Sequence, residues 1–257
     1  MKRFLHISLV VLFIAAISAL MGFIVYEHGR QHIGDLKIYI SGTDQGGFLN
    51  EQIIKRIIKS YDSIDTVQVR HFNARKLEEA ISKNPFVEDV DAYLGINRDL
   101  IINVEEREAL LRIYLPDNRS FYLDKNGVIF PLCDYFTPRT LIANGYIKAP
   151  AIRNYTCVSD TMYAGSDLPG LFHLAEKINE RPFLKAEISQ IYINSKGKYD
   201  LIPEVGQHTV RLGRPEDTDK KLDYLEAFYK EKLPKEGWNK YKIINLEYKN
   251  QIVCIKK

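Results

Sequence analysis

The feature that most constrains this chain is an uninterrupted apolar run close to its start. Residues Phe4 to Tyr26 contain no Asp, Glu, Lys or Arg, and His6 is the one side chain among them that titrates near neutral pH. At 1.5 Å per residue, a helix of this length covers the roughly 30 Å hydrocarbon core of a bilayer. The sequence therefore predicts a transmembrane helix over residues 4–26.

A cleaved signal peptide is the alternative for this run. Ala16-Ile17-Ser18 resembles a small-residue cleavage site, but apolar residues continue to Val25, which is long for the core of a signal peptide. Lys2 and Arg3 precede the run, so the positive-inside rule assigns residues 1–3 to a cytoplasmic stub. We expect a single-pass protein of the inner (plasma) membrane, with the bulk of the chain in the periplasm.

Composition narrows the class of the remaining chain. With 257 residues, 46% hydrophobic and 27% charged, it is long enough for one or two globular domains and too polar for several membrane spans. A net charge of +3 gives no sign of a nucleic-acid-binding surface. Cys133, Cys157 and Cys254 are too few for a disulfide framework; both a Cys133–Cys157 bridge and isolated buried thiols remain open.

The pattern becomes regular after a polar linker at residues 27–35. It predicts a strand from Leu36, a helix with its apolar stripe at residues 53–61, and a second helix capped by Asn73. Asn84-Pro85 ends that helix, and two alternating strands follow around residues 89–94 and 100–106. The prediction is a first folded domain at residues 36–108 with the order strand, helix, helix, strand, strand.

Residues 109–257 read as a strand-rich domain with one prominent helix that begins near Pro215. The pattern predicts hairpins over residues 121–130 and 188–202. Residues 133–166 carry no clear pattern. The apolar closing segment, residues 241–255, reads either as one strand or as a hairpin that turns at Lys249-Asn250. The predicted fold class is therefore α+β.

Motifs for catalysis are scarce. The glycines of Gly42–Gly47 follow a strand, but no Lys-Ser or Lys-Thr pair comes after them, and a turn explains them better than a phosphate loop does. No serine lies in a Gly-x-Ser-x-Gly elbow. Glu106 and Arg107 end a strand and are candidates for ordering a domain junction through charge-assisted hydrogen bonds. We predict no catalytic residues, no cofactor and no metal.

Several motifs, in this order, resemble the FtsQ/DivIB family of bacterial cell-division proteins. The strand pair is preceded by Asn84-Pro85-Phe86-Val87 and ends in Glu105-Glu106-Arg107-Glu108. Later come Tyr122-Leu123-Asp124-Lys125-Asn126-Gly127 and the closing Ile244-Asn245-Leu246-Glu247-Tyr248. The first domain, with its helix pair and strand order, resembles the POTRA module, a small docking domain of envelope proteins.

The resemblance implies a non-catalytic scaffold of the divisome at the division site, which helps to control septal cell-wall synthesis. It implies that the POTRA domain docks other division proteins and that the last strand binds the coiled-coil proteins FtsB and FtsL. It implies no nucleic acid and no small-molecule substrate. If the closing segment is one strand, alternate side chains share a face, and the partner-binding candidates are Leu246, Tyr248, Asn250, Ile252 and Cys254.

Two residues depart from the family pattern. Lys256 stands where some family members have an aromatic residue. Glu247 stands where a basic residue is usual, which implies a partner of reversed charge at that contact. Two other functions remain as alternatives. A POTRA-type docking subunit of an envelope secretion or outer-membrane assembly system would carry a β-barrel of roughly ten-residue amphipathic strands. A membrane-tethered envelope hydrolase would need a polar residue in a cleft whose substitution abolishes activity.

Overall fold

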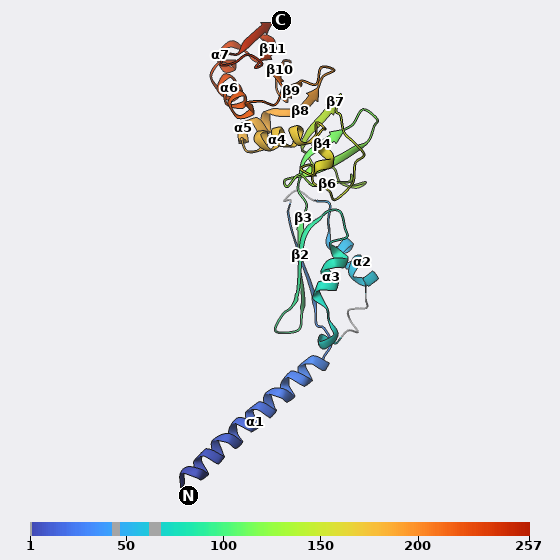
Figure 1. Cartoon of the computed structure of the whole chain (residues 1–257), viewed down its shortest axis with the longest axis vertical. Helices are drawn as coiled ribbons and strands as arrows, with labels where there is room; N and C mark the ends of the chain where they lie inside the picture. Colours follow the sequence, from blue (N-terminus) through green and yellow to red (C-terminus); the bar gives the residue numbers. More distant parts are fainter. Residues whose placement is uncertain (1, 43–46, 62–67) are drawn as a thin grey trace. The chain divides into compact units, whose positions relative to one another are not determined.

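The computed structural model describes residues 2–42, 47–61 and 68–257. It divides the chain into two compact units, residues 1–106 and residues 107–257. Figure 1 colours the chain by sequence and labels helices and strands where there is room.

The apolar run lies within one continuous helix, α1 (Lys2–Arg30). Within the described part of the chain, no helix combines the length and the apolar character that crossing a bilayer requires. The helical conformation predicted for residues 4–26 is present in α1.

The first unit has a three-stranded sheet with helices α2 (Glu51–Tyr61) and α3 (Ala74–Ile81). The sheet order is β1-β3-β2, and the central strand β3 (Leu100–Glu106) pairs in parallel with β1 (Leu36–Ser41) and antiparallel with β2 (Val87–Leu94). A short 3-10 turn, η2 (Val69–His71), precedes α3. The predicted order of strand, helix, helix, strand, strand is confirmed.

Both helices begin where the sequence supplies a cap. The Asn50 side chain accepts a hydrogen bond from the Ile53 backbone N–H at 2.9 Å, and Asn73 accepts one from the Lys76 N–H at 3.1 Å. Each bond satisfies a backbone donor that has no partner inside the helix. The buried helix residues and the inner sheet face form one core, with Ile54, Ile58, Leu77, Ile81, Ile102 and Val104 nearly inaccessible. Of the turn predicted at Gly42–Gly47, residues 43–46 lie outside the described residues.

The second unit has a nine-stranded mixed sheet in the order β12-β11-β10-β9-β8-β7-β4-β5-β6. The strands are β4 (Ala109–Tyr114), β5 (Ser120–Asp124), β6 (Ile129–Phe130), β7 (Leu141–Gly145), β8 (Ile188–Ile193), β9 (Tyr199–Pro203), β10 (Thr209–Gly213), β11 (Tyr241–Asn245) and β12 (Val253–Lys256). Both predicted hairpins, β5–β6 and β8–β9, are present.

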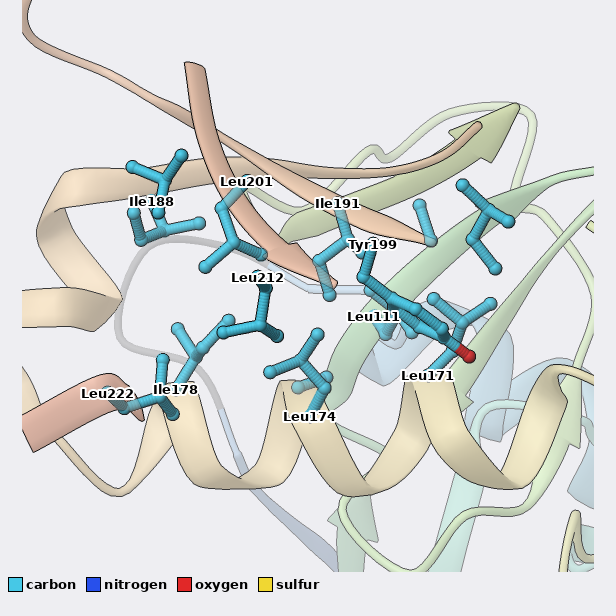
Figure 2. Close-up of a cluster of buried hydrophobic side chains, with 14 of the residues drawn as sticks. Leu111, Leu171, Leu174, Ile178, Ile188, Ile191, Tyr199, Leu201, Leu212 and Leu222 are labelled. Carbon is cyan, nitrogen blue, oxygen red and sulfur yellow. The ribbon is translucent and has the colours of Figure 1, made fainter. Parts of the chain in front are cut away.

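Helices α4 (Leu168–Asn179), α5 (Pro182–Glu187), α6 (Thr218–Glu231) and α7 (Leu233–Glu236) belong to the same unit, as does the 3-10 turn η3 (Thr161–Tyr163). Figure 2 shows the buried face of α4, where Leu171, Leu174 and Ile178 point toward apolar side chains of the strands. The opposing strand residues include Ile191, Leu201 and Leu212, all with no exposed surface. This burial supplies the main stabilising free energy of the unit.

The unassigned residues 133–166 contain a central strand. β7 pairs in parallel with β4 on one side and with β8 on the other. A parallel strand finds its neighbours far away in the sequence, so local turn signals do not reveal it. All three cysteines are free thiols, so the Cys133–Cys157 bridge is absent.

We expect Leu174→Ala to destabilise the second unit by about 2–5 kcal/mol, because it opens a cavity against the strands in a fully buried site. The measurement is urea unfolding followed by fluorescence of Trp238, the only tryptophan of the chain, which packs against the same core. His173→Ala, an exposed position on the same helix, is the control. Equal midpoints for the two variants would contradict this account of the core.

Candidate partner-docking edge

The closing segment forms a hairpin and not one long strand. β11 and β12 pair antiparallel, with Ile244 opposite Cys254 and Asn245 opposite Val253. Asn250 lies in the connecting turn with φ of 59°, a left-handed conformation that asparagine tolerates better than most residues. The alternative of a hairpin turning at Lys249-Asn250 is therefore the one observed. The five candidate residues do not share one strand face.

Three of the candidates face the core. Leu246 is buried, and its N–H donates to the Arg211 carbonyl at 2.9 Å. Ile252 and Cys254 are partly buried and pack against the same apolar cluster. Burial raises the pKa of the Cys254 thiol, which keeps it protonated at neutral pH. These three residues hold the hairpin in place and do not present themselves to a partner.

The outward face of the hairpin carries other residues. Val253 and Ile255 alternate with Cys254 and expose 38% and 47% of their surface. Tyr248, in the connection between the strands, exposes 52%. Of the predicted candidates, Tyr248 and Asn250 are exposed; Val253 and Ile255, which the single-strand alternative places on the opposite face, are exposed as well. In the sequence, the turn-favouring residue Asn250 is the signal that distinguishes the hairpin from a single strand.

The two edges of the large sheet differ. At one edge, β6 is covered by an irregular segment: the Ile129 N–H donates to the Thr156 carbonyl at 2.9 Å, and the Tyr155 N–H donates to the Ile129 carbonyl at 2.8 Å. At the other edge, β12 ends the strand order, and no described strand pairs with its outer side. A terminal strand of this kind presents a row of backbone donors and acceptors to an incoming segment.

Glu247 is neutralised within the chain. Its carboxylate forms an ion pair with Lys198 at 2.7 Å, and this hydrogen-bonded lysine, together with its charge, lowers the pKa of Glu247. Asn245 Oδ1 accepts a hydrogen bond from the Glu247 N–H at 2.8 Å, which fixes the backbone at this point. Glu247 therefore has a structural role on the sheet, and a partner of reversed charge stays a prediction.

Glu106 belongs to the first unit. Its two carboxylate oxygens accept hydrogen bonds from the backbone N–H groups of Phe48 and Leu49 at 3.0 and 2.9 Å, and the side chain is almost fully buried. A Cβ atom at Gly47 would overlap both carboxylate oxygens, so a glycine is required there. Glu106 thus fastens the chain leading into α2 to the end of β3.

Arg107 belongs to the second unit. Its guanidinium forms an ion pair with the fully buried Asp124 and lies over the ring of Phe130 at 5.8 Å. The other oxygen of Asp124 accepts hydrogen bonds from the N–H groups of Asn126 and Val128, both at 2.8 Å, which shapes the β5–β6 turn. The two adjacent residues predicted for a junction therefore each bind inside their own unit.

Comparison with known families decides the identity of the chain. A family described as "FtsQ/DivIB, C-terminal related" matches residues 108–255, and a "POTRA-like domain" matches residues 32–105. The chain belongs to the FtsQ/DivIB family. No curated protein matches it significantly.

Within this FtsQ/DivIB protein, the described residues contain no group of three or more His, Cys, Asp or Glu side chains arranged to hold a metal. One surface hollow of about 510 Å³ in the second unit has Arg119, Lys148 and Met162 in its lining. Another, of about 540 Å³, lies along α3 and β2. Titratable groups with strongly shifted pKa values lie elsewhere: burial raises the pKa of Tyr199 and Tyr229 in the core of the second unit.

We predict that Gly47→Ala destabilises the first unit by roughly 1–3 kcal/mol, because the new methyl group displaces the Glu106 carboxylate from two buried N–H donors. Hydrogen exchange of the β1 and β3 amides measures the effect. Gly165→Ala is the control, since a Cβ there meets nothing within 4 Å. Unchanged exchange in Gly47→Ala would show that the carboxylate does not fasten this loop.

Proposed function

We propose that this FtsQ/DivIB family member is a non-catalytic scaffold of the division machinery, and that it binds a partner segment by addition of a strand to β12. The family is a division-related scaffold family whose members are generally non-catalytic. The observation that carries the proposal for this chain is the unequal treatment of the two sheet edges, because β6 is covered while β12 is open.

Strand addition suits the geometry of β12. The backbone groups on its outer side would supply hydrogen bonds and register to an extended partner segment, while side chains at alternate positions would supply selectivity. Val253 and Ile255 offer apolar contacts on the exposed face, and Tyr248 stands beside them with half of its surface accessible. By resemblance to the family, the partners proposed for this edge are the coiled-coil proteins FtsB and FtsL.

Lysines surround the same edge. Lys242, Lys249, Lys256 and Lys257 are all exposed. Lysines on an edge strand oppose pairing between copies of the same chain, because like charges would be brought together. The same charges favour a partner strand that carries acidic side chains.

We propose further that the protein acts at the division site of the cell envelope, with its folded units outside the cytoplasm, and that the POTRA-like unit docks other division proteins. The mechanism is assembly. Holding partners beside one another raises their effective concentration and so stabilises a complex that controls septal wall synthesis. The POTRA-like match over residues 32–105 supports a docking role for the first unit.

The binding proposal predicts that Tyr248→Ala and Ile255→Asp each weaken partner binding by about thirtyfold or more. A tyrosine at an interface centre contributes about 2 kcal/mol or more on truncation, and a charge at Ile255 would be desolvated by the incoming strand. Affinity is measured with the full chain and the purified FtsB–FtsL pair.

Tyr224→Ala is the matched control, because Tyr224 is also exposed, at 42%, but lies on α6. Equal affinity for wild type, Tyr248→Ala and Ile255→Asp would reject β12 as the docking edge. In cells, depletion of the protein is expected to give filaments, and a tagged copy is expected at midcell. Normal septation without midcell recruitment would reject the division role itself.

A further inference from the structure

A buried histidine lies next to the docking edge. His208, at the entrance to β10, exposes only 3% of its surface, and its Nε2 lies 2.8 Å from the hydroxyl of Tyr229 on α6. Tyr229 has no exposed surface, and its ring meets the His208 ring edge-on at a centroid distance of 5.5 Å. The pair joins the β9–β10 loop to α6 in the interior of the second unit.

The other ring nitrogen of His208 is buried without a partner. Nδ1 makes no hydrogen bond of full geometry, although the Trp238 carbonyl interacts with the ring. Gly206, with φ of +97°, brings the loop so close that a Cβ there would stand 2.8 Å from Nδ1. The Trp238 ring packs on Tyr229 at 5.7 Å. His208 therefore contacts the loop, α6 and the connection between α7 and β11 at one point.

The end of the docking strand is tied to this same loop. Lys257, which follows β12, donates from Nζ to the side chain of Gln207 at 2.7 Å and from its backbone N–H to the Lys240 carbonyl at 3.2 Å. Gln207 is the neighbour of His208 in sequence. A movement of the loop that holds His208 would thus break the Lys257–Gln207 contact, one of the bonds that hold the residue after β12, beside the pairing of β12 with β11.

We propose that His208 is a proton-sensitive latch for the docking edge: the neutral imidazole holds the β9–β10 loop and the end of β12 together, and its protonation releases them. The first part stands on the geometry of His208 alone. The consequence for partner binding rests on the function proposed above for β12.

The charge balance around the ring makes protonation costly. A protonated imidazole donates from both nitrogens, so Nε2 could no longer accept from Tyr229, and the Trp238 carbonyl would be the acceptor open to Nδ1–H. Burial lowers the pKa of His208, the charge of Lys257 lowers it further, and the Trp238 carbonyl offsets part of the shift. The neutral form is therefore the one that the folded state favours.

Glu187 on α5 is the nearby carboxyl group that could compensate a buried cation. It interacts electrostatically with Tyr229, and one of its oxygens is buried without a hydrogen-bond partner. Burial raises the pKa of Glu187, with a smaller contribution from Glu204. As the pH falls, Glu187 therefore takes up a proton at a higher pH than an ordinary glutamate does. Its negative charge is then lost in the pH range where an imidazolium would need it.

The sign of the pH effect follows. The folded state has a lower pKa at His208 than the unfolded chain, whose value is about 6.5. The latch therefore contributes full stability above that value and loses it as the pH falls toward the pKa of the folded state. Uptake of one proton changes the opening equilibrium by at most about tenfold per pH unit.

The test is hydrogen exchange of residues 253–257 in the full chain, kept in mild detergent, between pH 7.5 and 5, after correction for the intrinsic rates. The latch predicts that protection falls by more than tenfold across this range in wild type, and that His208→Gln loses this dependence because glutamine does not titrate. His173→Gln, an exposed histidine on α4, should behave as wild type. Protection independent of pH in wild type would overturn the proposal.

Titration of the His208 ring proton by NMR keeps the test decisive if His208→Gln does not fold. A midpoint below 6.5, with protection lost between about 6.5 and that midpoint, supports the latch, whereas an ordinary midpoint contradicts it. Affinity for the FtsB–FtsL pair is then measured at pH 7.5 and 5.5. If the pair does not bind at either pH, the docking function is rejected, but the proposal for the latch is unaffected. If the pair binds with the same affinity at both pH values although the β12 amides lose protection, the regulatory role is rejected.

Discussion

Backbone pairing across the nine-stranded sheet is the constraint on which the rest of the second unit depends. Every strand from β11 to β5 has a neighbour on both sides, so its N–H and C=O groups are satisfied inside the protein. The series must stop somewhere, and it stops in two different ways. The β6 end is covered by the segment around Thr156, whereas the β12 end is left to the solvent. The functional proposal follows from that asymmetry.

The same sheet determines which residues of the C-terminal hairpin are structural. Pairing of β12 with β11 turns Cys254 toward the apolar cluster and Val253 and Ile255 away from it. Leu246 enters the core, and Lys198 holds Glu247 over the sheet. An edge strand that is anchored by its inner face can offer its outer backbone without losing its position. A docking surface of this kind is preorganised, which reduces the entropy that a partner must lose on binding.

The boundary between the two units shows how neighbouring residues can serve different cores. Glu106 accepts two backbone hydrogen bonds inside the first unit, and Arg107 pairs with the buried Asp124 inside the second. Each charge is buried with hydrogen-bonding partners, so neither carries the full desolvation penalty of an isolated ion. The two side chains fix the end of one unit and the start of the next, one residue apart.

The sequence by itself determined the local elements of this protein. Asn50 and Asn73 indicated where the two helices start, and the alternation in residues 100–106 indicated β3. The turn at Asp124-Lys125-Asn126-Gly127 indicated a hairpin. These features could be predicted because caps, pleats and turns depend on near neighbours. It also named Tyr248 as a partner-binding candidate and Glu106 and Arg107 as candidates for ordering a domain junction. Only the tertiary structure decided that β7 lies in the middle of the sheet, that the closing segment folds back at Asn250, and that Val253 and Ile255 are exposed while three of the five candidates face the core. Strand order and edge exposure depend on contacts between residues far apart in the chain, and so does the contact of His208 with Tyr229. No local sequence pattern shows which distant groups will form a hydrogen bond.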